Sequence, residues 1–351
     1  MRRLAFSARL APASLVASWI AFAAPAAAQE VNLNYDRLSS LEEPIAFDLG
    51  RVTVEVTGVA DAPLVADFSG LESNGSDGDS VQAEFVGNLQ VSAETQLANR
   101  WRVGLAYFGQ YATTAIDTFD GGEDYSDNLA GFVGTSVGTV LGGNVMGQVR
   151  EITRRQRGVG NGFLAFDNFY GELDRWGGAY VGRFGPSTVG AVVDENGDFE
   201  VGAVFQRPLG RKDYRFSARF RQSRFVAADG VNEFDSAGVG GVAELVYGST
   251  IYDVGVAYER LESAVVDLDR WFLSAGAQTQ MGVIRLSGEG HYGEVDGDDE
   301  VSASLGASYD IARGLSFNLG VNYRDARIVS NGVTLFDTDE VQAIASVRFS
   351  F

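Results

Sequence analysis

The sequence predicts an all-β fold, a transmembrane antiparallel up-and-down barrel of about sixteen strands. Three observations support this prediction. Apolar and polar residues alternate along most of the chain after Arg51, as in strands with one apolar and one wet face. Short polar turns alternate with longer acidic loops, a pattern typical of barrels that cross a membrane. The chain also ends on such a strand, residues 339–351, whose last residue is the aromatic Phe351.

The first 28 residues have the composition of a cleaved secretory signal peptide. Arg2, Arg3 and Arg9 accompany an apolar stretch, and three alanines precede Gln29. We therefore expect residues 1–28 to be a signal peptide, 29–50 an N-terminal extension and 51–351 the barrel. No later run of 18 apolar residues exists, so a transmembrane helix is excluded and strands are the remaining way to cross a membrane.

Composition excludes several classes of partner and cofactor. The net charge of −20 would repel nucleic acid, so we expect no nucleic-acid partner. The chain has no cysteine and only one histidine, His291, which leaves no metal-ligand spacing. We expect no metal, no cofactor and no catalytic residues.

Strands can be placed in order from the alternation. In residues 101–111, for example, Trp101, Val103 and Leu105 share one face, and Arg102 and Gly104 share the other. The predicted strands are 51–59, 81–97, 100–114, 128–137, 139–150, 166–174, 178–185, 199–207, 213–225, 237–248, 250–262, 270–281, 282–293, 300–311, 314–327 and 339–351. An even number of strands places both chain ends on the same side of the membrane.

The height of the apolar belt favours a membrane barrel over a water-soluble sandwich. Trp101 and Tyr111 lie ten residues apart on one face, which corresponds to about 33 Å at about 3.3 Å per residue. A strand tilt of about 40° reduces this to about 25 Å, the expected separation of two aromatic girdles. The sandwich is further disfavoured because the other face is often Gly or Ser.

Residues Phe169–Phe184 have the pattern of a strand, a tight turn and a second strand with Gly182-Arg183-Phe184 near its end, and residues 131–143 have a weaker form of it. These segments resemble the general diffusion porins of Gram-negative bacteria, of an alphaproteobacterial type. Phe351 resembles the family's terminal signal for the barrel-assembly machinery. The resemblance implies sixteen strands, a homotrimer, an outer-membrane location and passive diffusion of small hydrophilic solutes. The barrel would then lie among outer-membrane lipid and lipopolysaccharide.

In that family the loop after the fifth strand folds into the lumen and narrows the pore. Here two segments are candidates for such a loop, 150–165 and 186–198. The first contains an arginine cluster, Arg150, Arg154, Arg155 and Arg157. Guanidinium groups remain charged at neutral pH, so a cluster opposite carboxylates would set a field across a pore. The alternative is that these arginines bind lipopolysaccharide phosphates or pair with acidic loops.

Alternation places further charged residues on the polar face, where they are candidates to line the pore. The basic candidates are Arg102, Arg215, Arg219 and Arg221, followed by Arg285, Arg324 and Arg348. The acidic candidates opposite them are Glu84, Glu94, Glu244, Glu259 and Glu289 or, from the second candidate loop, Asp194, Glu195 and Asp198.

We expect a non-enzymatic channel for passive diffusion of ions and small hydrophilic solutes. One alternative is a substrate-selective channel, with Phe108 or Phe272 on the inner wall. Others are a barrel hydrolase at His291 and a non-conducting envelope barrel.

Overall fold

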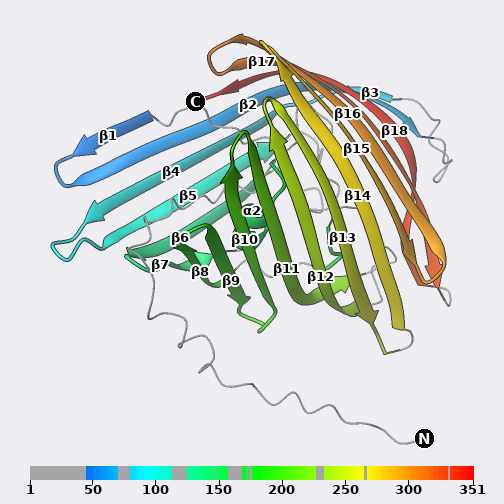
Figure 1. Cartoon of the computed structure of the whole chain (residues 1–351), viewed down its shortest axis with the longest axis horizontal. Helices are drawn as coiled ribbons and strands as arrows, with labels where there is room; N and C mark the ends of the chain where they lie inside the picture. The colour runs from blue at the N-terminus through cyan, green and yellow to red at the C-terminus, as the bar shows by residue number, and fades with distance from the viewer. Residues whose placement is uncertain are drawn as a thin grey trace, which may run out of the picture.

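The computed structural model describes residues 45–69, 80–112, 125–145, 147–156, 168–171, 173, 176–226, 233–264, 267–330 and 333–351. Their strands form one antiparallel sheet that closes on itself (Figure 1). The expected signal peptide and residues 29–44 of the expected extension lie outside the described residues.

Sixteen strands run round the barrel, each paired with the next, and β18 pairs with β2. They are β2 (Val52–Ser69), β4 (Val86–Gln96), β5 (Arg102–Ala112), β6 (Tyr125–Thr135), β7 (Gly138–Asn144), β8 (Trp176–Phe184), β9 (Ser187–Asp194), β10 (Phe199–Leu209), β11 (Lys212–Val226), β12 (Glu233–Tyr247), β13 (Thr250–Glu262), β14 (Asp267–Met281), β15 (Ile284–Val295), β16 (Asp298–Ala312), β17 (Leu315–Ser330) and β18 (Val333–Ser350). Two shorter strands, β1 (Ile45–Leu49) and β3 (Ser80–Ala83), also pair with β2. The predicted all-β barrel of about sixteen strands is confirmed.

The barrel closes where the C-terminus meets β2. The Phe351 amide donates to the Gly58 carbonyl over 3.0 Å, and the Gly58 amide donates to the Phe351 carbonyl over 2.9 Å. The part of β2 that precedes Gly58, Val52–Val56, pairs with β1 instead. Figure 1 shows both strands extending beyond the C-terminus. Closure satisfies the edge hydrogen bonds that would be costly in lipid.

The two faces of the sheet have opposite chemistry. Along β16, Leu305 is 66% exposed on the outside, whereas the neighbouring Ser304 is 3% exposed on the inside. Trp101 and Tyr111 are both exposed, as their shared outer face predicts. An apolar outer surface of this extent is suited to lipid, and the polar inner face is suited to water.

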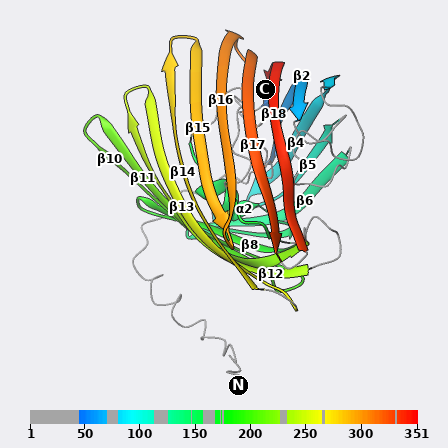
Figure 2. The same ribbon diagram turned by 90° about the vertical axis from the view of Figure 1, so that its right-hand side faces the viewer.

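The two rims differ in the length of their connections. At one rim tight turns use glycine at positive φ, 68° at Gly210 and 63° at Gly248. The opposite rim holds the long connections, including the one between β7 and β8. Following the expected orientation of such barrels, we name the rim of tight turns the periplasmic rim and the opposite rim the outer rim. Figure 2 shows the strands running between these rims.

Two errors in the predicted strands cancel in the total of sixteen. Residues 166–174 are wrong as a strand, because the described part, 168–171 and 173, is irregular. Conversely, residues 187–194 were not predicted as a strand but form β9. The segment Phe169–Phe184 is therefore not a strand–turn–strand unit, since only β8 in its second half is a strand.

The only helix in the described part of the chain is α2 (Gln148–Thr153), which follows β7. No helix among these residues is long and apolar enough to cross a membrane.

Candidate functional site

The connection between β7 and β8 enters the barrel and is called here the inward loop; its described residues are Val145, 147–156, 168–171 and 173. It follows the fifth strand of the closed barrel. Its helix α2 lies within the ring of strands (Figure 1). The other candidate segment, 186–198, consists mainly of wall strand β9 and a short connection to β10.

Helix α2 rests on two glycines that are paired across β9 and β10 and face inward, Gly190 and Gly202. A Cβ atom on Gly202 would lie 2.7 Å from Val149 Cγ1 and 2.8 Å from Thr153 Cγ2. One on Gly190 would lie 2.5 Å from Ile152 Cδ1. Because Gly190 and Gly202 have no side chains, they leave the space that the helix occupies.

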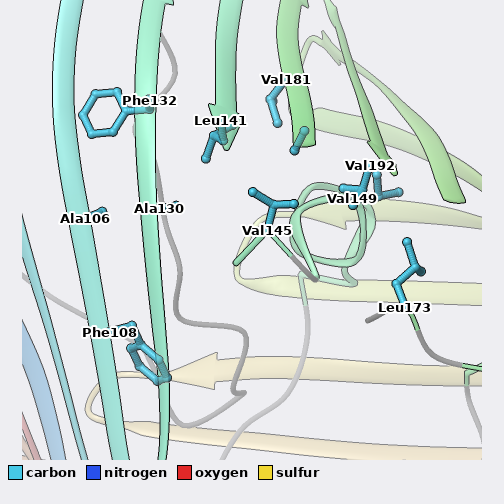
Figure 3. Close-up of a cluster of buried hydrophobic side chains, with 11 residues drawn as sticks. Ala106, Phe108, Ala130, Phe132, Leu141, Val145, Val149, Leu173, Val181 and Val192 are labelled. Atoms are coloured by element: carbon cyan, nitrogen blue, oxygen red, sulfur yellow. The ribbon is translucent and has the colours of Figure 1, made fainter. Parts of the chain in front are cut away.

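An apolar cluster inside the barrel extends this contact (Figure 3). Val145 and Val149 of the loop are fully buried with inward side chains of β5–β9, among them Phe132, Leu141 and Val192. Burial of such side chains from water contributes about 1.5–3 kcal/mol each. Phe108 belongs to this cluster and is 4% exposed, so it is not available as a solute contact.

The end of α2 is tied to the wall by two arginines with carboxylate partners. Arg155 Nη1 donates to Asp253 Oδ1 over 2.5 Å, and its Nη2 donates to Ser274 Oγ. Arg215 on β11 pairs with Glu244 and also donates to the Ile152 carbonyl over 2.8 Å. All of these guanidinium and carboxylate groups are buried, and each has a charged partner.

A second anchor holds the returning part of the loop through Tyr170. The Tyr170 amide donates to Glu259 Oε1 over 2.9 Å, and its hydroxyl donates to Glu300 Oε2 over 2.5 Å. Arg270 lies between the two carboxylates, 3.0 Å from Glu259 and 2.7 Å from Glu300, and its guanidinium stacks 4.0 Å from the centre of the Tyr170 ring. Burial raises the pKa of Tyr170 well above its usual value.

His291 completes this anchor from β15. Its Nε2 lies 3.1 Å from Glu300 Oε1, and its ring lies 5.0 Å from that of Phe272. Both residues are almost wholly buried, His291 at 4% and Phe272 at 3% exposure. Neither side chain is therefore available to a solute in the lumen.

Arg219 and Arg221 hold the loop between these two anchors. Arg219 donates to Asn168 Oδ1 over 2.7 Å and lies 4.7 Å from the centre of the Phe169 ring. Arg221 donates to the Gly171 carbonyl. Both guanidinium groups approach Glu200, at 3.8 and 3.3 Å.

The remaining members of the arginine cluster differ from Arg155. Arg154 pairs with Glu151 over 3.4 Å on the partly exposed side of α2. Burial raises the pKa of Glu151, although Arg154 and Arg150 oppose the shift. Arg150 is half-buried on the same helix, and Arg157 lies outside the described residues.

The other predicted residues lie away from the inward loop. Arg102 and Glu94 pair over 3.0 Å near the periplasmic rim. Asp194 accepts the amides of Asn196 and Asp198, each over 2.9 Å, and so shapes the β9–β10 connection that also contains the exposed Glu195. Glu84 lies between β3 and β4, where its amide donates to the Pro63 carbonyl.

Alternation alone did not identify four of the charged residues that hold the loop. These are Glu200, Asp253, Arg270 and Glu300, all inward and buried. Each occupies an inner-face position of its strand, so a full count of that face would have included them. In the described part of the chain no group of three or more His, Asp or Glu side chains is placed to hold a metal ion.

Comparisons with known proteins agree with this architecture. No protein-family model and no curated protein matches the chain. Among solved structures, the trimer form of OmpT, an outer membrane protein of Vibrio cholerae, is similar with a TM-score of 0.66 at 15% identity, over 86% of this chain and 100% of that chain. An anion-selective porin from Comamonas acidovorans is similar with a TM-score of 0.62 at 12% identity, over 86% and 100%.

A triple mutant of the Rhodopseudomonas blastica porin is also similar, with a TM-score of 0.51 at 14% identity, over 85% of this chain and 100% of that chain. At these identities the likeness concerns the fold. The chain folds as a sixteen-stranded antiparallel barrel like those of these solved porin and OmpT structures.

Proposed function

We propose that this chain forms a water-filled channel in the outer membrane of a Gram-negative bacterium, through which ions and small hydrophilic solutes diffuse passively. One observation carries the proposal: the described part of the inward loop is tied to the wall by its hydrogen bonds. These go to inward residues of β11–β14 and to Glu300 of β16, and apolar contacts reach β5–β9 and, around Tyr170, also Val295 of β15 and Ile328 of β17. In the described part of the loop, none of these hydrogen bonds reaches β17, β18, β2 or β4.

Transport in such a channel needs no chemical step. Solutes would be filtered by the width of the lumen and by the charges on its wall. The two anchors hold the described parts of the loop against the wall, so the width of the lumen would stay constant. The arrangement supports a passive channel rather than an enzyme.

We further propose that the channel is a homotrimer, since the similar OmpT structure is described as a trimer form. Its partners would be outer-membrane lipid and lipopolysaccharide, and Phe351 would mark the chain for the barrel-assembly machinery. Removal of residues 1–28 as a signal peptide would precede assembly.

The proposed channel activity can be tested by measuring the conductance of the purified protein in planar bilayers. We expect ohmic steps grouped in threes, together with swelling of liposomes in small sugars that declines with sugar size. A protein that inserts but shows no conductance would contradict the proposal and favour an envelope barrel. Saturable block by one solute would instead favour a substrate-selective channel.

The hydrolase alternative depends on His291. A catalytic histidine must reach its substrate, whereas this ring is buried between Glu300 and Phe272. Its contacts support a structural role. Esterase activity that is lost in His291→Ala, but kept in variants of other inward residues, would revive the hydrolase alternative.

A further inference from the structure

We propose that the outer face of the periplasmic rim binds the headgroup of an anionic phospholipid through three cations, Arg207, Arg211 and Lys212. They lie near the end of β10, in the turn that follows it and at the start of β11, and are called here the rim cations. The inference rests on the position of the barrel in a membrane and not on whether the barrel conducts, so its failure and that of the channel are separate results.

Strand register places the rim cations close together. Arg207 is opposite Tyr214, and Lys212 is opposite Leu209, so Arg207 and Lys212 are diagonal neighbours on one face of the sheet. That face is the outer one, on which Leu209 is 62% exposed. Diagonal neighbours on adjacent strands are about 7–8 Å apart, and the turn between the two strands carries the third cation. These long side chains can therefore reach one phosphate group.

The rim cations have no carboxylate partners. All three residues are exposed, and none of them forms an ion pair in the described part of the chain. The outward positions of β10 and β11 hold no Asp or Glu. The neighbouring Asp213 is on the inner face, where it accepts a hydrogen bond from Gln206 Nε2 over 2.8 Å. The positive charge of this surface is therefore open to an anion that approaches from outside the barrel.

Cations at the other end of these strands are neutralised. Arg224, near the outer end of β11, lies 3.3 Å from Asp198 and 3.8 Å from Glu233. Arg260 on β13 lies 2.7 Å from Glu262. In a chain with a net charge of −20, carboxylates are abundant enough to pair every cation, and at the outer rim of these strands they do so. The unpaired cations of the periplasmic rim are thus a local feature that fits a phosphate partner.

Tyrosines on the same face mark the level of the rim cations as the surface of the membrane. Tyr247 is opposite Lys212, and its ring centre is 5.8 Å from Lys212 Nζ. Tyr247 and Tyr252 of the next strand are 52% and 50% exposed. Such rings are enriched at the level of lipid headgroups. Toward the middle of the barrel the face is apolar, with Phe205 opposite Phe216. The rim cations therefore lie where the phosphates of a phospholipid lie, rather than on a surface that faces bulk water alone.

The chemistry favours a headgroup that has a net negative charge. A guanidinium group can donate two parallel hydrogen bonds to a phosphate, and an ammonium group attracts it as a point charge. The ammonium of a zwitterionic headgroup would be repelled by the unpaired cations, whereas phosphatidylglycerol has no cation. Each Lys or Arg near an anionic lipid surface contributes about a fivefold preference.

The test is native mass spectrometry of the folded barrel in detergent micelles, titrated with dioleoylphosphatidylglycerol or with dioleoylphosphatidylcholine. We expect one phosphatidylglycerol per chain to bind severalfold more tightly than phosphatidylcholine. The triple variant Arg207→Gln, Arg211→Gln and Lys212→Gln should lose this preference. Arg207→Gln alone should weaken phosphatidylglycerol binding about fivefold, which keeps the test usable if the triple variant does not fold.

A matched control removes three outward cations near the outer rim, Arg224→Gln, Arg260→Gln and Arg327→Gln. It changes the net charge by the same amount and should keep the preference. Equal affinity of the wild type for the two lipids, or an equal loss of preference in the control, would overturn the inference. Displacement of the bound phosphatidylglycerol by excess inorganic phosphate would also overturn it, because the rim cations would then bind a free anion rather than a lipid.

Discussion

The loop wall of this barrel, β9–β14, and the open wall, which means β15 and β16 around Arg285 and Asp310, use the same residue types for different purposes. On the loop wall, Arg270 is 0% exposed and contacts two carboxylates that also bind Tyr170. On the open wall, the side chains of Arg285 and Asp310 remain 30% and 33% exposed. An arginine on the inner face can therefore hold a loop in place or remain partly exposed inside the barrel. Its burial and its partners decide between the two roles.

The largest difference between the walls should follow from removing the charge at the centre of the anchor. Arg270→Met leaves Glu259 and Glu300 buried without their cation, and breaking one partner of such a pair costs about 3–5 kcal/mol. We expect samples of this variant to lose the folded band on cold SDS gels after heating to a lower temperature than the wild type. We also expect a larger and noisier single-channel conductance, because the loop is released.

Arg285→Met is the matched control on the open wall. Partly exposed pairs contribute about 0–1 kcal/mol, so its unfolding temperature should stay near that of the wild type. Equal losses in both variants would show that the two walls do not differ as described.

A smaller effect should follow from filling the space under helix α2. Gly202→Val places side-chain atoms where Val149 and Thr153 now lie, and overpacking of this kind costs about 1–3 kcal/mol. The helix should shift away from β9 and β10 into the lumen and lower the single-channel conductance. Gly142→Ala is the control, because no atom lies within 4 Å of the added Cβ. Unchanged conductance in Gly202→Val would mean that the position of α2 does not depend on the space beside Gly202.

The sequence predicts the barrel better than it predicts the loop, and the two misassigned segments show why. Phe169, Tyr170 and Leu173 are apolar because the loop buries them against the wall, so the segment has the composition of a strand. Strand β9 shows no clean alternation, since Val192 packs under the loop while Val193 faces outward. Where a wall strand is apolar on both faces, period-2 reasoning fails.

The candidate site was predictable in residue type but not in role. Alternation correctly places Arg215, Arg219 and Arg221 on the inner face. Their neutralisation depends on partners distant in the sequence, as does that of Arg155, which is 98 residues from Asp253. Only the strand register brings such groups together. The inward glycines Gly190 and Gly202 are the local signal of where the loop lies.

The smallest expected effect concerns the Tyr170 hydroxyl. Tyr170→Phe keeps the ring and removes one hydrogen bond to Glu300, which retains Arg270 and His291 as partners. The expected loss of stability is about 1 kcal/mol. Because burial raises the pKa of Tyr170 in the folded state, the wild type is stabilised by this group below the usual tyrosine pKa of about 10. That stability is lost as the pH rises above 10, where the unfolded chain ionises first. Thermal unfolding followed from pH 8 to 11 should thus decline less steeply in Tyr170→Phe than in the wild type, and parallel curves would show that the hydroxyl does not link the loop to the wall.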